Sequence, residues 1–335
     1  MSDLFKIICT IIATFVGAGF ASGKEIYLYF FRYGKYGFLG IFLSSIFLGF
    51  IIYKSMLIIK KNNINNYNDF LEIIIKNKII KKIFKKLINY YLLLSFCIMI
   101  NGFCNLIKQE FNINIYFSYI YIFFICLYCY FKNIKIFLKI NTFLIPIIFF
   151  SILFFLFFNF KNINLKNNIY EKNNFFNNYF FSFIIYANYN LLSIIPVITI
   201  ITKYLKNKKL VKISSVFFAI IIFLLSISIF FILQNGDVYC WNQDMPLISI
   251  FKKISNNYLI FYFFIILFSI ITTAISLGYS YINKNNKKIH LFLLFITSLL
   301  LINFSFSDLI KFLYPICGFF GIMQSYYIVK NRNKN

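Results

Sequence analysis

Acidic residues and histidine are scarce in this chain of 335 residues, which has nine Asp and Glu and one His. They form no cluster with metal-ligand spacing, and the H-E-x-x-H, G-x-S-x-G and P-loop patterns are missing. The seven cysteines are scattered, and only Cys240 falls in a predicted external loop, which excludes a disulfide framework. We therefore expect neither an enzyme nor a resident organic cofactor.

Long apolar runs fill the chain instead, and 61% of its residues are hydrophobic. A membrane span needs about 20 apolar residues. The sequence predicts an all-α integral membrane protein with one transmembrane domain over residues 1–335. Ten segments meet or approach the required length: 4–33, 37–59, 87–107, 113–131, 134–158, 179–202, 213–234, 258–282, 289–305 and 309–329.

Positive charge is abundant, with 34 Lys and Arg and a formal net charge of +25. If the N-terminus lies in the cytoplasm, 23 of these residues fall in cytoplasmic regions and nine on the opposite face. The positive-inside rule then predicts that both termini are cytoplasmic. Anionic lipids are a sufficient partner for the basic loops, so nucleic acid is not expected. Protein partners are not indicated.

Three connections between the predicted spans are longer than the rest. The cytoplasmic segment at about 69–86 alternates Ile and Phe with Lys, which predicts an interfacial amphipathic helix. Residues 161–178 form a predicted external loop rich in Asn. In the external connection 236–257, Pro246 introduces a short apolar stretch that predicts a small helix capping the bundle.

Glycine is also rare, yet three of the twelve glycines fall inside the first predicted span, in the run Gly17-Ala18-Gly19-Phe20-Ala21-Ser22-Gly23. Glycine in a helix interior costs about 1 kcal/mol relative to alanine. Irregular backbone at membrane depth is tolerated where it is buried in protein or lines a cavity. The run therefore predicts a break whose peptide groups bind a ligand. The alternative is a tight helix–helix crossing, which also favours small residues.

The sixth predicted span carries a second polar interruption, Tyr186-Ala187-Asn188-Tyr189-Asn190, followed by Pro196. Two mid-span asparagines and a proline predict a second break. Interrupted helices at matching places in two oppositely oriented halves are typical of secondary transporters. We expect five-plus-five inverted repeats, about 4–158 and 179–329, with Tyr186, Asn188, Tyr189 and Asn190 facing the substrate. The asparagines have the alternative of bonding freed carbonyls.

Two further polar residues lie inside predicted spans. Glu25 is the only acidic residue well within one, which makes it a candidate substrate contact, proton carrier or cation partner. Its alternative is an ion pair with Lys24 or Arg32 in a water-filled vestibule. Asn101 is expected to face the substrate cavity, with helix–helix hydrogen bonding as the more common use.

The run from Val16 to Glu25 resembles the signature of the YkvI family of bacterial membrane proteins, a family similar to amino acid–polyamine–organocation transporters. Three shorter stretches agree with it: Tyr189-Asn190-Leu191, Thr272-Thr273-Ala274, and Tyr314-Pro315 with Gly318 and Gly321. The resemblance implies a ten-helix LeuT-type fold in the bacterial cytoplasmic membrane. Lys24 departs from the family, whose members usually carry Gln there.

The resemblance also implies a sodium site in which Thr272 and Thr273 join the carbonyls of Gly17, Ala18 and Phe20. Oxygen-only coordination suits a hard cation, although threonines in membrane helices often bond their own i−4 carbonyl. We expect a secondary transporter of a small organic solute, an amino acid or amine by analogy, coupled to Na⁺ or H⁺. The alternative, favoured by Lys24, is a sensor or partner-binding protein that moves no solute. A channel is less favoured because no charged ring is visible.

Overall fold

The computed structural model describes residues 3–131, 134–159, 178–205, 207–282 and 287–331, and these residues form helices and their connections without any strand. The chain runs through two 3₁₀ turns, η1 (Phe31–Tyr33) and η3 (Thr202–Tyr204), and through these helices: α1 (Asp3–Phe15), α2 (Ala18–Ala21), α3 (Lys24–Tyr29), α4 (Lys35–Lys61), α5 (Tyr67–Ile74), α6 (Lys78–Phe111), α7 (Ile115–Phe131), α8 (Ile134–Asn159), α9 (Tyr179–Ile201), α10 (Lys208–Leu233), α11 (Val238–Asn242), α12 (Pro246–Ile254), α13 (Asn256–Ile282), α14 (Lys287–Leu301) and α15 (Phe306–Lys330). Of the predicted external loop, residues 161–177 lie outside the described part.

Each predicted span is occupied by helix, with α1, α2 and α3 sharing the first one. Within the described residues, seven helices are long and apolar enough to cross a membrane by themselves: α4, α6, α8, α9, α10, α13 and α15. The apolar helices α7, with 17 residues, and α14, with 15, are shorter. The predicted class, an all-α membrane protein, is confirmed. The count of ten spans and the inverted repeat stay predictions.

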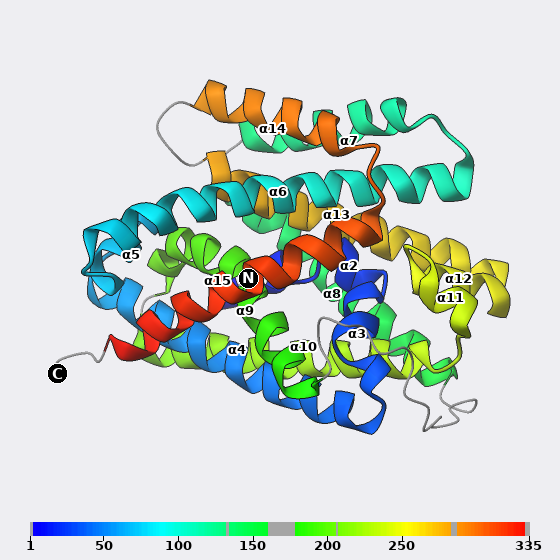
Figure 1. The fold of residues 1–335 in the computed structure, drawn as a ribbon, viewed down its shortest axis with the longest axis horizontal. Helices are drawn as coiled ribbons and strands as arrows, with labels where there is room; N and C mark the ends of the chain where they lie inside the picture. Colours follow the sequence, from blue (N-terminus) through cyan, green and yellow to red (C-terminus); the bar gives the residue numbers. More distant parts are fainter. Residues whose placement is uncertain (1–2, 132–133, 160–177, 206, 283–286, 332–335) are drawn as a thin grey trace.

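Helix α9 lies at the centre of the bundle, and every residue from 185 to 202 is buried. Helices α1, α4 and α15 pack directly against it, and α10 packs against α1 and α4. A second group contains α6, α7, α13 and α14, with α7 and α14 on the outer side of α6 (Figure 1). Helix α13 also contacts α1, so it joins the two groups along the first segment.

The predicted break in the sixth segment is wrong, because α9 is helical from Tyr179 to Ile201. The Asn188 amide donates to the carbonyl of Ile184 at 2.7 Å, and the Asn190 amide donates to the carbonyl of Tyr186 at 3.0 Å. Both asparagines thus donate one turn back along their own helix, which pairs their NH2 groups without unwinding it. From residue 185 onward the helix is buried among its neighbours.

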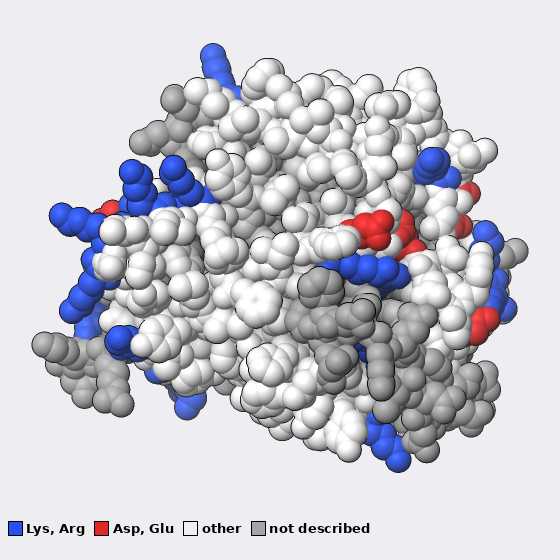
Figure 2. Space-filling model, viewed as in Figure 1, with Lys and Arg blue, Asp and Glu red and all other residues white. Residues whose placement is uncertain are grey.

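The predicted amphipathic segment at 69–86 is divided between two helices. Asn77 caps the second, accepting hydrogen bonds from the amides of Ile79 and Ile80 at 2.9 and 3.2 Å. Residues 78–86 are therefore the first turns of the long helix α6, and α5 is a separate short helix. Lys and Arg gather at this end of the molecule, beside a broad region without charge (Figure 2).

The short helix predicted at Pro246 is confirmed as α12 (Pro246–Ile254), and its external position stays a prediction. Pro246 occupies the first turn of α12, where its missing N–H leaves no helical hydrogen bond unmade. Helix α11 precedes α12, and the two pack on one another at the right of Figure 1. We call α11 and α12 with their connection the α11–α12 hairpin.

Candidate functional site

The first segment is broken as predicted, between the end of α1 at Phe15 and the start of α2 at Ala18. The Gly17 amide donates to the Phe15 carbonyl at 3.0 Å, and the Ala18 amide donates to the thioether sulfur of Met99 in α6 at 3.3 Å. In an α-helix the Gly17 amide would bond the carbonyl four residues earlier, that of Ala13. This carbonyl is therefore released from the helical ladder.

A second interruption separates α2 from α3 at Ser22 and Gly23. Gly23 has a φ of +80°, a left-handed conformation that glycine adopts without steric cost. The Ser22 carbonyl accepts from the amide of Leu247 at 3.0 Å, and the Ala21 carbonyl accepts from the hydroxyl of Tyr262 at 2.7 Å. The broken segment is thus bonded to both the α11–α12 hairpin and α13.

The remaining residues of the glycine-rich run face the protein interior. A Cβ at Gly19 would lie 2.3 Å from Oε1 of Glu25, so only glycine leaves room for this carboxylate. The Phe20 ring packs edge-on against Phe15 at 5.3 Å, and Phe15 packs against Tyr186 of α9 at 6.0 Å. The two polar stretches singled out in the sequence therefore lie together in the core, although one of them is regular helix.

Three backbone carbonyls converge on the hydroxyl of Thr273 in α13. Its Oγ1 lies 2.7 Å from the carbonyl oxygen of Ala13, 2.8 Å from that of Val16 and 2.9 Å from that of Ser269. A hydroxyl has one hydrogen and donates to one acceptor at a time. At any moment the other two carbonyl oxygens therefore direct lone pairs at Thr273 Oγ1 without receiving its hydrogen. A set of ligands made only of oxygens is the kind that a hard cation takes.

This cluster contains Thr273, one of the two expected threonines, and none of the three carbonyls that the resemblance implied. Thr272 donates to the Ser269 carbonyl at 3.0 Å, three residues back in its own helix, and it is Thr273 that makes the i−4 bond of the alternative, also to Ser269. On the side of the first segment, the carbonyls that contact Thr273 are those of Ala13 and Val16, which come earlier in the chain than the implied ones. The expected carbonyls instead accept from amides three or four residues further on and close the turns of α2: Gly17, Ala18 and Phe20.

Glu25 points into a group of tyrosine rings. Its side chain is 3% exposed, and its Oε2 accepts a hydrogen bond from the hydroxyl of Tyr189 at 2.6 Å. The Tyr189 ring stacks on Tyr314 at 4.4 Å and lies 5.6 Å from both Tyr29 and Tyr186, measured between ring centroids. Helices α3, α9 and α15 therefore border the carboxylate with aromatic rings. We call these four residues the tyrosine cluster.

The basic residues beside Glu25 bond to other groups. Lys24 is 1% exposed, and its Nζ donates to three carbonyls at the end of α11: Trp241 at 3.1 Å, Asn242 at 3.4 Å and Gln243 at 2.7 Å. Arg32 donates to the hydroxyl of Tyr33 at 3.0 Å. The ion pairs in the described part of the chain leave Glu25 out: Asp3–Lys6, Glu72–Lys85 and Asp237–Lys253.

Asn101 does not take the expected place in the substrate site. Its amide nitrogen lies within 3.1 Å of the carbonyls of Leu301, Ile302 and Phe304, where α14 ends. Its Oδ1 accepts from the amide of Asn105 at 2.8 Å. The side chain thus ties α6 to the end of α14, which is the helix–helix role left open by the sequence.

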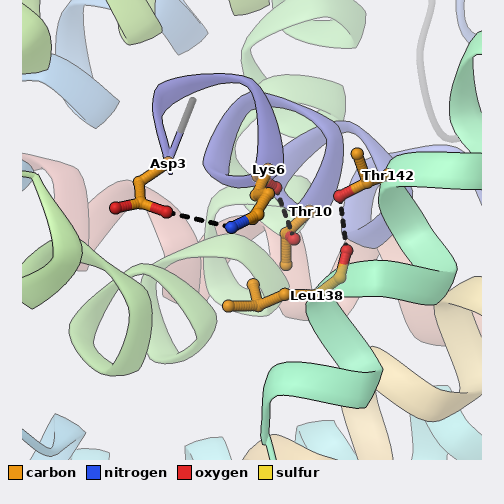
Figure 3. Close-up of polar contacts among 5 residues, drawn as sticks. All are labelled: Asp3, Lys6, Thr10, Leu138 and Thr142. Atoms are coloured by element: carbon orange, nitrogen blue, oxygen red, sulfur yellow. Dashed lines mark hydrogen bonds and ion pairs between the residues drawn. The ribbon is translucent and has the colours of Figure 1, made fainter. Parts of the chain in front are cut away.

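A cavity of about 870 Å³ opens beside the first turns of α1, between that helix, α8 and Tyr204. Figure 3 shows its polar contacts, in which Lys6 pairs with Asp3 at 3.0 Å and Thr142 bonds the Leu138 carbonyl in α8. By the predicted topology this is the cytoplasmic end of α1. Ala13, whose carbonyl contacts Thr273, lies further along the same helix, roughly 9 Å beyond Ile7 at 1.5 Å per residue.

Several residues of the site were not singled out in the sequence. Tyr29 carries no local signal of a ligand, because aromatic residues make up 23% of the chain, and Tyr314 was named only as part of a stretch that agrees with the family resemblance, without a role in the site. Ser269 lies four residues before Thr273, and this spacing on one helix face was an available signal. The carbonyls of Ala13 and Val16 could not be chosen from residue types, since every residue has a carbonyl.

The arrangement defines a class of integral membrane protein with a transporter fold. Among solved structures the chain is similar to Mhp1, a nucleobase-cation-symport-1 family transporter. The inward-facing conformation of Mhp1 matches with a TM-score of 0.56 and 12% identity over 98% of this chain and 76% of that one. The closed conformation with bromovinylhydantoin bound gives 0.52 and 10%, over 98% and 74%. These matches confirm the LeuT-like fold.

At the level of sequence, the chain is 26% identical over 137 residues to the membrane protein YkvI of Bacillus subtilis (strain 168). The match covers 41% of this chain and 39% of that protein. No protein-family model matches the chain. The match thus covers less than half of either protein.

Proposed function

We propose that this protein is a sodium-coupled secondary transporter of a small organic solute, working by alternating access in a bacterial cytoplasmic membrane with both termini inside. The observation that carries the proposal is the convergence of the Ala13, Val16 and Ser269 carbonyls on Thr273, at a break in the first helix. Carbonyls freed by unwound helix are the usual ligands of coupling ions in transporters.

Coupling follows from where this cluster lies. One of its carbonyls belongs to the last turn of α1 (Ala13) and one to the break that follows (Val16), and its other two oxygens belong to α13, so a bound cation holds the broken segment against α13. Release of the cation frees α1, whose first turns border the cavity in Figure 3. A ligand shifts such an equilibrium only by its difference in affinity between the two states. Sodium therefore favours the state in which α1 is held.

Solute binding is assigned to Glu25 and the tyrosine cluster. These residues adjoin the broken segment on one side and belong to α9 on the other, so movement of either helix changes access to them. Lys24 was the feature that favoured a non-transporting sensor. Its ammonium group lies against the carbonyls of α11, away from the cation cluster, and so gives that alternative no support.

The test is uptake into proteoliposomes of labelled amino acids and amines, with and without an inward sodium gradient. Thr273→Val keeps the shape of the side chain and removes the hydroxyl. Ser276→Ala is the matched control, because Ser276 is one turn further along α13 and its hydroxyl bonds only the Thr272 carbonyl among the contacts described. We expect sodium-dependent uptake that is retained in Ser276→Ala and reduced at least about tenfold in Thr273→Val, a loss of 1.4 kcal/mol of binding.

Uptake that ignores the sodium gradient, or that is equal in wild type and Thr273→Val, would show that the cluster does not couple an ion. If solutes stabilise the purified protein but none of them enters the vesicles, the proposal of transport is itself refuted.

A further inference from the structure

The cavity of about 870 Å³ between α1, α8 and Tyr204 has both charged and apolar walls (Figure 3). Its volume is in the range of sites that bind small molecules. Three of its lining residues are charged: Asp3, Lys6 and Lys139. Its apolar wall comes from four others: Ile7, Leu138, Phe143 and Pro146. The cavity therefore fits an amphiphilic ligand, with a polar end near the lysines and an apolar end against the remaining wall.

Positive charge exceeds negative charge at this cavity. Lys139 is exposed and takes no part in the ion pairs of the described residues. Lys6 does pair with Asp3, but the lysine and aspartate side chains are 36% and 55% exposed. An ion pair this exposed contributes little stability, so the Lys6 ammonium group can turn to another anion. The polar end of a fitting ligand is therefore negatively charged.

The cavity continues into an exposed apolar strip along α8. Five side chains at spacings of three and four residues share this face, each at least 37% exposed: Phe143, Ile147, Phe150, Phe154 and Phe157. Phe143 belongs both to the strip and to the cavity wall. Because α8 is long and apolar enough to cross a membrane, the strip meets hydrocarbon when the protein is in a bilayer. A ligand from the bilayer can thus keep its chain on the strip while its headgroup lies in the cavity.

We propose that this cavity binds one anionic phospholipid of the cytoplasmic leaflet, with its phosphate between Lys6 and Lys139 and an acyl chain along the α8 strip. The site differs from the general attraction of anionic lipids to basic loops, because it holds a single molecule and uses the apolar wall as well as charge. The bound lipid contacts α1 and α8 together, so it holds the first turns of α1 in place. Its binding does not rest on the transport function proposed above.

The experiment counts the lipids that stay bound to purified full-length protein, by mass spectrometry of the intact protein released from detergent micelles. The micelles contain equal amounts of dioleoyl phosphatidylglycerol and dioleoyl phosphatidylcholine, which have the same chains and differ in net charge. Glycerol phosphate, added in a separate sample, presents the phosphate without chains. We expect one retained phosphatidylglycerol, bound at least about tenfold more tightly than the choline lipid, a difference of 1.4 kcal/mol. Glycerol phosphate is not expected to be retained.

Two pairs of variants locate the bound lipid. Lys139→Gln should weaken the binding of phosphatidylglycerol at least about fivefold, the contribution of one lysine near a lipid surface. Its control is Lys82→Gln, which removes an exposed lysine from the first turns of α6 and should bind like wild type. Phe143→Ala removes part of the apolar wall and should weaken the binding of phosphatidylglycerol. Its control is Phe124→Ala, at an exposed position of α7.

Equal binding of the two lipids, or retention of glycerol phosphate by itself, would overturn the proposal. Equal losses in Lys139→Gln and Lys82→Gln would do so as well, because the lipid would then be held only by the general attraction of basic regions. Wild-type binding in both Lys139→Gln and Phe143→Ala would place the lipid elsewhere on the protein. Sodium-dependent uptake is measured separately, so each of the two proposals can fail while the other stands.

Discussion

Replacement of Lys24 by Met tests whether one buried ammonium group holds the α11–α12 hairpin on the broken segment. Methionine keeps the length and the apolar stem of lysine, and the change removes the three hydrogen bonds to the end of α11 and the contact of the ammonium group with the Tyr27 ring. The hairpin keeps other attachments to the first segment, one of them the contact of Trp241 with Phe31 at 5.3 Å between ring centroids. The Leu247 amide bonds the Ser22 carbonyl, and the Trp241 ring stacks on Tyr27 with 6.1 Å between centroids.

The magnitude follows from the geometry of those bonds. Two of them, at 2.7 and 3.1 Å, have good lengths, and the third at 3.4 Å adds little. Hydrogen bonds to charged groups contribute about 1.5–3 kcal/mol each, or roughly 3–6 kcal/mol for two. Gln243 is partly exposed, so water recovers part of this when lysine is absent. We expect the docked hairpin to lose about 3 kcal/mol, which raises its open population roughly 100-fold.

Cys240 reports the opening, because it lies in α11 and is fully buried while the hairpin is docked. The measurement is the rate at which a polar maleimide modifies Cys240 in purified protein, followed by peptide mass spectrometry, which separates this thiol from the other cysteines. Lys253→Met is the matched control. Lys253 belongs to the same hairpin and is exposed, and its ion pair with Asp237 stays within that hairpin.

The expected result is rapid labelling in Lys24→Met and wild-type labelling in Lys253→Met. Equal rates in wild type and Lys24→Met would refute the reasoning, since the hairpin would then be held by packing alone. Rapid labelling in both variants would mean that α11 unfolds locally, independently of its contact with the first segment.

Two other substitutions test the packing that places the site. Gly321→Ala should lower the melting temperature through about 1–3 kcal/mol of overpacking, because the new Cβ would lie 2.2 Å from the Asn188 carbonyl oxygen; the control is Ile316→Ala at an exposed position of α15. An unchanged melting temperature would mean that α9 and α15 separate at little cost. Asn101→Leu removes the hydrogen bonds from the side chain to the end of α14 and should destabilise that end by about 1–3 kcal/mol, the net contribution of two or three hydrogen bonds. The measurement is amide hydrogen exchange in the last turn of α14, which should become faster. Unchanged exchange there would contradict the assigned role of Asn101.

The features that were predicted correctly depend on local properties of the chain. Apolar length identified the helical segments, because a span must cover the hydrocarbon core with its own residues. The break at Gly17 and the helix beginning at Pro246 also follow from the residues at those positions. Glycine and proline act on the backbone directly, so their effect is visible in sequence.

The error in the sixth segment has a physical reason. Asn188 and Asn190 are as unfavourable in lipid as the sequence suggests, but each finds a carbonyl on its own helix, and neighbouring helices exclude lipid from α9. Polar residues in a span therefore show that a side chain needs a partner. They do not show whether unwinding the helix supplies it.

By itself the sequence determined the class of protein, the position of the first break and the isolation of one carboxylate within a span. Only the tertiary structure decided which carbonyls contact Thr273, which rings border Glu25 and which carbonyls accept hydrogen bonds from the ammonium group of Lys24. Each of those contacts joins helices far apart in the chain, Lys24 and Gln243 being an example. Such partners are selected by how whole helices pack, whereas breaks and spans are set by the residues of the segment itself.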